Sequence, residues 1–86
     1  MDKHTILGIH VKSRAASAAN IQKVLSEFGC NIKTRIGLHD ASPTTCSPSG
    51  VILLELVGED PKIELLCKKL GAIREVETKL MVFEGV

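Results

Sequence analysis

The side chains that could do chemistry in this 86-residue chain are two imidazoles, a thiol and a guanidinium, contributed by His10, His39, Cys46 and Arg14. Imidazole nitrogen and thiolate sulfur are good ligands for transition metals, so His10, His39 and Cys46 could form a metal or redox sensor. Their spacing matches no known ligand motif, because the sequence has neither a CxxC nor an HxxxH pair. Solvated side chains at strand ends are the simpler interpretation, and we expect no bound cofactor.

A second candidate site lies where a predicted strand gives way to a predicted helix, at Lys12, Ser13 and Arg14. A helix N-terminus presents unpaired N–H groups and the positive end of the helix dipole, and Arg14 adds a charged fork. A small carboxylate could bind there, although a serine cap followed by an exposed arginine explains the same residues. The sequence has no nucleophile elbow, glycine-rich phosphate loop or close acid pair in a suitable context. We therefore expect no catalytic residues and no enzyme.

Four strands and two helices must position these residues, because the hydrophobic period changes repeatedly along the chain. Period-two alternation predicts strands at residues 5–12, 30–38, 51–57 and 74–83. Helical spacing predicts the two intervening helices, which are bounded by the caps Ser13 and Asp60, Pro61 at the first helical position, a left-handed stop at Gly29, and a stop at Gly71. Residues 39–50, rich in Ser, Thr, Pro and Gly, are predicted to form a long loop.

Two strand-helix-strand halves in tandem predict a ferredoxin-like βαββαβ sandwich in the α+β class. Right-handed crossovers that each leave room for one strand give the antiparallel order 4-1-3-2, with both helices on one face. The predicted sheet residues of the core are Leu7, Ile9, Val11, Ile32, Ile36, Ile52, Leu54, Leu56, Val76, Leu80 and Val82. The predicted apolar stripes of the helices are Ala18, Ile21, Val24, Leu25 and Phe28, and Ile63, Leu66, Cys67 and Leu70.

The other face of the predicted sheet carries no helix. Its centre is predicted to hold Ile6, Gly8 and His10 beside Val51, Leu53, Glu55 and Val57, with Lys33, Arg35, Glu77 and Lys79 mainly on the edge strands. An apolar centre with a polar rim is typical of a contact surface, and so short a chain leaves much apolar area hard to bury. We expect a homodimer or higher oligomer, formed through this face or by an edge strand. The expected contacts are Ile6, Val51, Leu53 and Val57.

Composition narrows the classes of partner. The formal net charge is +1 and the only aromatic residues are two phenylalanines, so neither a basic field nor stacking platforms for bases exist, and we expect no direct nucleic acid binding. No signal-peptide segment or membrane-spanning run is evident, which favours a cytoplasmic protein without membrane contact. Three cysteines do not form a disulfide framework. Cys30 and Cys67 are expected to pack as small hydrophobes, and Cys46 to be accessible.

The helix-to-strand junction resembles a known turn. Ile21, Leu25 and the run Gly29-Cys30-Asn31-Ile32 look like the "G-x-N-I" turn of ACT domains, which are ferredoxin-like modules that bind amino acids or similar effectors and pair into dimers. The chain as a whole is similar to the ACT-like proteins called iron-only hydrogenase system regulators. The residues that carry this likeness are Arg35-Ile36-Gly37-Leu38-His39, Cys46-Ser47-Pro48-Ser49-Gly50, and Val51 through Gly58.

The resemblance implies a single ACT-like domain over residues 1–86 with a regulatory role. A ligand site would comprise Lys12, Ser13, Arg14 and Asn31, and its effector would be a small carboxylate, unless the partner is a protein. The chain has Lys12-Ser13-Arg14-Ala15 where effector-binding ACT domains usually have Asp-x-Pro-Gly, which argues against amino-acid binding. The metal-sensing half of nickel-responsive repressors, RNA-recognition domains and acylphosphatases have a similar layout. This sequence lacks evident matches to the ligand positions of the nickel-responsive repressors and to the stacking aromatic residues of RNA-recognition domains. It also lacks the glycines of the acylphosphatase phosphate-binding loop.

Overall fold

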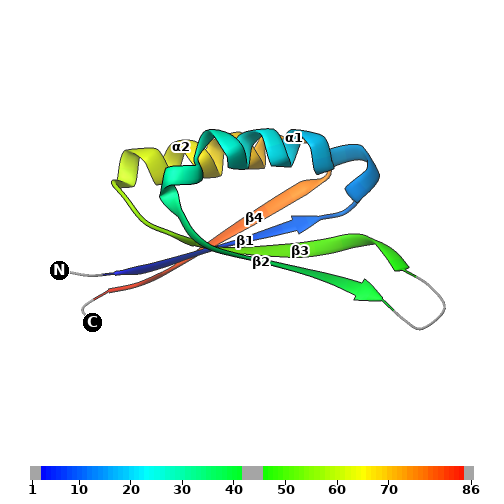
Figure 1. Cartoon of the computed structure of the whole chain (residues 1–86), viewed down its shortest axis with the longest axis horizontal. Helices are drawn as coiled ribbons and strands as arrows, with labels where there is room; N and C mark the ends of the chain where they lie inside the picture. The colour runs from blue at the N-terminus through cyan, green and yellow to red at the C-terminus, as the bar shows by residue number, and fades with distance from the viewer. Residues whose placement is uncertain (1–2, 42–45, 85–86) are drawn as a thin grey trace.

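The computed structural model describes residues 3–41 and 46–84, which form a four-stranded antiparallel sheet with both helices on one face (Figure 1). The elements in chain order are β1 (His4–Val11), α1 (Arg14–Glu27), a short 3₁₀ helix (Gly29–Asn31), β2 (Ile32–Ala41), β3 (Cys46–Leu56), α2 (Asp60–Gly71) and β4 (Val76–Phe83). The sheet order β2-β3-β1-β4 is the predicted order 4-1-3-2 counted from the opposite edge. The predicted ferredoxin-like fold is confirmed.

The hydrophobic core lies between the sheet and the two helices. Alternate residues of β1, Leu7, Ile9 and Val11, are buried beneath the helices, as the period-two pattern predicts. The rest of the buried apolar core comprises Ile21, Leu25, Phe28, Leu54, Leu56, Ile63, Leu66 and Leu70. Burial of apolar area of this kind supplies most of the free energy that favours folding. The prediction that Leu80 and Val82 belong to the core was wrong: they lie on the helix side but are 48% and 44% exposed, because a hollow beside α2 leaves them uncovered.

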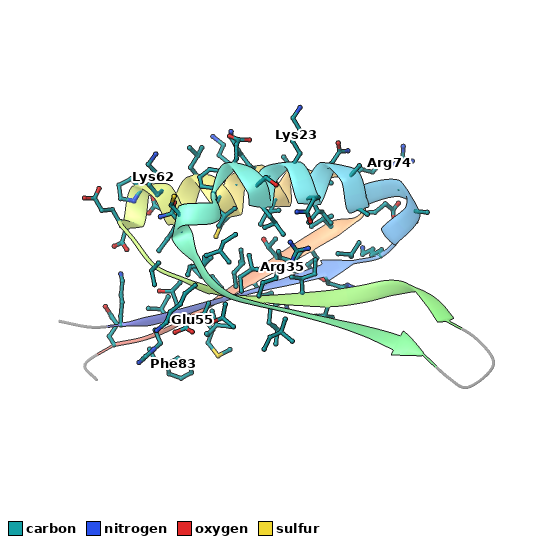
Figure 2. The ribbon with its side chains drawn as sticks, viewed as in Figure 1. Lys23, Arg35, Glu55, Lys62, Arg74 and Phe83 are labelled. Carbon is teal, nitrogen blue, oxygen red and sulfur yellow. The ribbon has the colours of Figure 1, made fainter. Side chains whose placement is uncertain are left out.

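A β-bulge between Ile32 and Thr34 changes which face the rest of β2 presents. The extra residue places Thr34 opposite Glu55 and Ile36 opposite Leu53, so Ile36 lies on the face without helices and is 50% exposed. Arg35 pairs with the buried Leu54 and lies on the side that the helices cover (Figure 2). The predictions that Ile36 belongs to the core and Arg35 to the open-face rim were therefore wrong, because a bulge reverses every later side chain.

The first helix differs from its prediction in phase and in its end. Ser17 is buried and Ala18 is exposed, so the stripe of α1 passes through Ser17, whose hydroxyl donates a hydrogen bond of 2.7 Å to the Arg74 carbonyl. Such a partner makes a buried hydroxyl tolerable. The helix ends at Glu27 and continues into the 3₁₀ turn without a left-handed residue at Gly29. The second helix is capped by Glu59, one residue before the predicted cap.

Strands β2 and β3 run on past the end of β1, as Figure 1 shows. Val11, the last residue of β1, pairs with Gly50, and beyond this point β3 continues to Cys46, which pairs with Ala41. Much of the predicted loop 39–50 is therefore strand, although residues 42–45 lie outside the described residues. Pro48 is compatible with this strand because β3 pairs there only with β2, and its other edge needs no N–H donor.

Candidate functional site

The face of the sheet without helices, called the open face from here on, carries a diagonal apolar band. In register, Ile6 lies between Glu55 and Met81, and Gly8 lies between Leu53 and Lys79. The band runs from the end of β4 across β1 and β3 to β2, and consists of Phe83, Met81, Ile6, Leu53, Val51 and Ile36. Met81 and Phe83 are each 52% exposed, slightly more than Ile36 at 50%. Figure 2 shows Phe83 and Glu55 projecting away from the helices.

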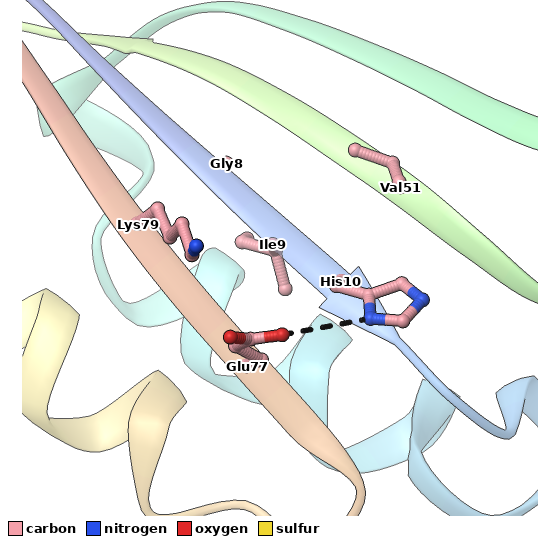
Figure 3. Close-up of a pocket in the computed structure, with 6 residues that line it drawn as sticks. All are labelled: Gly8, Ile9, His10, Val51, Glu77 and Lys79. Atoms are coloured by element: carbon pink, nitrogen blue, oxygen red, sulfur yellow. Dashed lines mark ion pairs between the residues drawn. The ribbon is translucent and has the colours of Figure 1, made fainter.

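The open face is hollowed over Gly8 in β1. The hollow has a volume of about 220 Å³ and is lined by Gly8, Ile9, His10, Val51, Glu77 and Lys79 (Figure 3). A Cβ atom at Gly8 would lie 3.7 Å from the Lys79 carbonyl oxygen and 3.8 Å from Leu53 Cδ2, which are ordinary contacts. The hollow therefore exists because Gly8 has no side chain, and its charged rim could receive a small polar ligand.

Two polar clusters flank the apolar band, one on each side. In the first cluster, Glu55 Oε2 lies 3.5 Å from His4 Nδ1, and Thr34 Oγ1 donates a hydrogen bond of 3.2 Å to Glu55 Oε1. In the second, His10 Nδ1 lies 3.8 Å from Glu77 Oε1, and Lys79 lies beside them (Figure 3). Each cluster pairs one imidazole with one carboxylate, and the second adds an ammonium group.

The residues of the predicted carboxylate site do not all lie together. Lys12 and Ser13 follow β1, and Ser13 is the N-cap of α1 with no hydrogen bond from its side chain to the helix. Arg14 begins α1, and its side chain lies outside the described residues. Asn31 instead precedes β2, whose first residue Ile32 pairs with Leu56 near the opposite end of β1. The structure therefore separates Asn31 from the other three residues by at least the six residue steps from Thr5 to Val11 along β1, or about 20 Å.

Asn31 has a structural role at that end of the sheet. Its side-chain Nδ2 donates a hydrogen bond of 2.9 Å to the backbone carbonyl of Val57, and its backbone carbonyl accepts one of 2.8 Å from the Val57 N–H. Together these bonds fasten the start of β2 to the connection between β3 and α2. Binding of a carboxylate by Lys12, Ser13 and Arg14 stays a prediction.

The alternative metal ligands are spread along the sheet. His10 on β1 pairs with Val51 on β3. His39 on β2 lies opposite Gly50 on β3, and Cys46 is the first residue of β3. From Val51 to Cys46 is five residues, or about 16 Å of strand. The side chains of His39 and Cys46 lie outside the described residues. Among the residues that are described, no three His, Cys, Asp or Glu side chains come close enough to hold a metal ion.

The predicted contact residues lie mostly where expected. Ile6, Val51 and Leu53 are half-buried on the open face, whereas Val57 follows β3 and is 42% exposed beside Asn31. Sequence reasoning missed three further members of the band, which are Ile36, Met81 and Phe83. The alternation of β4 with Glu77 and Lys79 could have found Met81 and Phe83, but no signal marks the bulge that turns Ile36 outward.

The two described thiols lie in different environments. Cys67 packs partly buried against the core, as predicted, and burial raises the pKa of its thiol. Cys30 is exposed in the 3₁₀ turn, so its predicted packing as a small hydrophobe was wrong. In the part of the chain that the structure describes, no helix meets the length and apolarity needed to span a bilayer.

Comparison with known proteins identifies one family and one fold. A family model described as "TM1266-like: Iron-only hydrogenase system regulator, putative" matches residues 3–80. The uncharacterized protein TM1266 from Thermotoga maritima is 26% identical, with a TM-score of 0.81 over 96% of this chain and 100% of that one. A comparison with curated proteins finds no match.

More distant solved structures have the same fold. CPII from Thiomonas intermedia K12, bound to ADP, AMP and acetate, is 11% identical with a TM-score of 0.58, over 98% of this chain and 89% of that one. A formyltetrahydrofolate deformylase from Pseudomonas putida KT2440 is 17% identical with a TM-score of 0.57, over 91% of this chain and 28% of that one. At these identities the likeness concerns the fold alone.

Proposed function

This chain belongs to the TM1266-like family of iron-only hydrogenase system regulators, and we propose that it is a non-catalytic regulatory module that acts as a homodimer through its open face. The observation that carries the proposal is the apolar band, which crosses all four strands with no element of the described chain to cover it. Contiguous exposed apolar surface rimmed by polar groups is typical of protein interaction sites.

The size of the open face suits a second copy of the chain. Strands lie about 4.8 Å apart and rise about 3.3 Å per residue, so four strands of eight residues give a face of about 19 by 26 Å. The projected area is about 500 Å², and side-chain relief adds to it. A standard interface buries about 800 Å² of accessible surface on each partner, so most of this face would be needed.

The positions of the two polar clusters also favour a second copy. If a two-fold axis lies along the apolar band, the bands of the two copies pack against each other. The cluster around Glu55 on one copy then faces the cluster of His10, Glu77 and Lys79 on the other copy. The carboxylate of Glu55 on one copy then faces the region of Lys79 on the other, twice per dimer. Complementary charge around an apolar centre fixes the orientation of such a pair and discourages other partners.

Sensing of a small carboxylate is part of the proposal and is assigned to the hollow over Gly8. Face-to-face pairing would enclose this hollow, and Lys79 would supply the ammonium group for the ligand. Thermal unfolding with acetate and larger carboxylates tests this step, because a ligand that binds the folded state raises its melting temperature. Stabilisation lost in Lys79→Ala but kept in Lys12→Ala supports the hollow. The reverse pattern would assign the ligand to the helix N-terminus at Ser13 instead.

Association through the open face is tested by light scattering and sedimentation at about 10 µM protein, where a dimer of micromolar affinity is substantially formed. Ile36→Lys places a charge in the band and is expected to halve the particle mass. Leu65→Lys is the matched control, because Leu65 is 43% exposed on α2 and lies away from the sheet. A wild-type monomer, or an Ile36→Lys variant with unchanged mass, would refute the open-face dimer.

A further inference from the structure

Strand β4 is an edge of the sheet. It pairs with β1 along its whole length, and no other described strand lies on its far side. Every second residue of an edge strand directs its N–H and C=O groups outward, where they can pair with an added strand. Natural proteins usually protect such an edge with charges, proline, a bulge or a covering element.

The second half of β4 lacks these protections. Leu80, Met81, Val82 and Phe83 are consecutive apolar residues that are 48%, 52%, 44% and 52% exposed. Leu80 and Val82 lie on the helix side of the sheet, and Met81 and Phe83 lie on the open face. An added β-strand is an element that covers both faces and the backbone edge of this run together.

The helix layer leaves a gap at this edge. Leu80 and Val82 line a hollow of about 190 Å³ together with Lys3, Thr5, Asp60, Ile63 and Glu64. At the outer end, Lys3 Nζ forms an ion pair with Asp60 Oδ1 at 2.8 Å, which holds the start of β1 against α2. The hollow leaves the helix side of β4 accessible, so a neighbouring strand can pack its own side chains against Leu80 and Val82.

We propose that β4 pairs with β4 of a second copy, antiparallel, with Met81 opposite Met81. Side chains directly opposite each other must share a face, and this register sets Leu80 opposite Val82 on the helix side. It also sets Lys79 opposite Phe83 on the open face, where the methylene chain of Lys79 can pack on the ring and its ammonium group stays free. The two four-stranded sheets then form one continuous eight-stranded sheet.

Neighbouring registers fit less well. Centring the pair on Lys79 would oppose two ammonium groups, which destabilises a cross-strand pair. Centring it on Leu80 would set Glu77 opposite Phe83 and leave Val82 opposite Thr78, so the apolar run would be covered less completely. Centring it on Val82 would set Met81 opposite Phe83 but Leu80 opposite the carboxylate of Glu84, so one apolar side chain would face a charge. The self-complementarity of the Met81 register identifies the occupant as a second copy of this chain.

The edge pairing rests on the self-association proposed above but uses a different surface. Its two-fold axis is perpendicular to the sheet, whereas the axis of the open-face dimer lies in the plane of that face. Two perpendicular two-fold axes that intersect generate a closed tetramer with D2 symmetry. With 9.3 kDa per chain, the expected particle is about 37 kDa.

Substitutions on the helix side of β4 separate the two interfaces, because Leu80 and Val82 do not belong to the open face. Leu80→Lys is expected to halve the mass of the tetramer, and so is Ile36→Lys. Combining the two should give a monomer, and Leu65→Lys should change nothing. Far-UV circular dichroism checks the fold, and Val82→Lys replaces Leu80→Lys if that variant unfolds.

The pattern of masses distinguishes the possible failures. If the wild type is a dimer that only Ile36→Lys dissociates, the edge pairing is refuted and the open-face dimer stands. If only Leu80→Lys dissociates it, the edge pairing stands and the open-face dimer fails. A monomeric wild type refutes both.

The register has a separate test. Opposed residues of an antiparallel pair have Cα atoms about 4.5–5.5 Å apart, within the range that a disulfide spans. Met81→Cys should therefore yield, on mild oxidation, a covalent dimer whose disulfide joins position 81 of both chains by peptide mass spectrometry. Lys79→Cys should not give a covalent dimer, because residue 79 of one chain lies opposite Phe83 of the other chain. Cross-linking at 79 in preference to 81 would overturn the proposed register.

Discussion

The two faces of the sheet are built from the same strands but differ in what covers them. Leu54 is fully buried under the helices, and its neighbour Leu53 is only half-buried on the open face. Likewise, Leu7 and Ile9 of β1 have no exposed surface, whereas His10 is exposed. Strand alternation assigns each side chain to a face, but the helices determine which face becomes the core. The covered face therefore stabilises the chain, and the open face is the surface that the proposed association uses.

The largest expected effect is on the covered face. Leu54→Ala removes a fully buried side chain and leaves a cavity, which should lower the free energy of unfolding by about 2–5 kcal/mol. Urea denaturation at low protein concentration measures this loss. Leu53→Ala is the matched variant on the other face, and its cost under the same conditions should be less than half as large. Equal costs would mean that the two faces do not differ as described.

The stabilities of the Leu53→Ala and Leu54→Ala variants should respond differently to protein concentration. If Leu53 contributes to association, the loss in Leu53→Ala should grow as the protein concentration rises, because subunit binding adds to the stability of the wild type by mass action. The loss in Leu54→Ala should change much less. A concentration-independent difference for Leu53→Ala would remove this residue from the interface.

The fold was predictable because periodicity reports burial. Alternation in β1, β3 and β4 assigned nearly every side chain of these strands to the correct face, and crossover handedness gave the sheet order. The face of Ile36 was not predictable, since Ile32, Thr34 and Ile36 alternate with Lys33 and Arg35 whether or not a bulge intervenes. A single extra residue in the pairing has no signature in the residue types.

The candidate site was predictable in part. The apolar centre of the open face follows from strand alternation, but the predicted role of Asn31 came from a turn motif, and its structural role depends on a contact with Val57 that sequence spacing does not reveal. The phase of α1 was mistaken for a similar reason. Ala18 is the more apolar residue, yet Ser17 is buried because the Arg74 carbonyl lies within reach of its hydroxyl.

Two glycines provide the next comparison. Gly58 lies in the connection between β3 and α2, and Gly8 lies on the open face of β1. Gly58 has φ of +111°, and a Cβ atom there would collide with the Asn31 amide. Gly58→Ala should therefore destabilise the fold by about 1–3 kcal/mol, through backbone strain and displacement of Asn31. Gly8→Ala meets only ordinary contacts and should cost less than about 0.5 kcal/mol.

Thermal and urea denaturation of the two glycine variants measure these costs. Adding Asn31→Ala to Gly58→Ala should recover the steric part of the loss but not the part due to backbone strain. A Gly58→Ala variant as stable as Gly8→Ala would show that the Asn31 contact does not constrain this turn.

A smaller effect distinguishes polar contacts in the two environments. Ser17→Ala deletes a buried hydroxyl and leaves the Arg74 carbonyl without its 2.7 Å partner, so we expect a loss of about 1–2 kcal/mol. Thr34→Val deletes the exposed bond to Glu55 on the open face and should cost about 0.5 kcal/mol or less. Both are measured by urea denaturation. A larger loss for Thr34→Val would indicate that the Glu55 cluster stabilises the single chain rather than an interface.

The smallest effect leaves folding unchanged and concerns thiol reactivity, which should differ between Cys67 against the core and the exposed Cys30. Only the thiolate reacts with iodoacetamide, and burial raises the pKa of the Cys67 thiol, so less thiolate is present there near pH 8. In a Cys46→Ser background, Cys30 should be alkylated several-fold faster, as followed by peptide mass spectrometry. Unfolding in urea should remove the difference, because it depends on the helix layer rather than on local sequence. If Cys67 reacted as fast as Cys30 in the folded protein, α2 would have to open readily, and the covered face would not be closed as described.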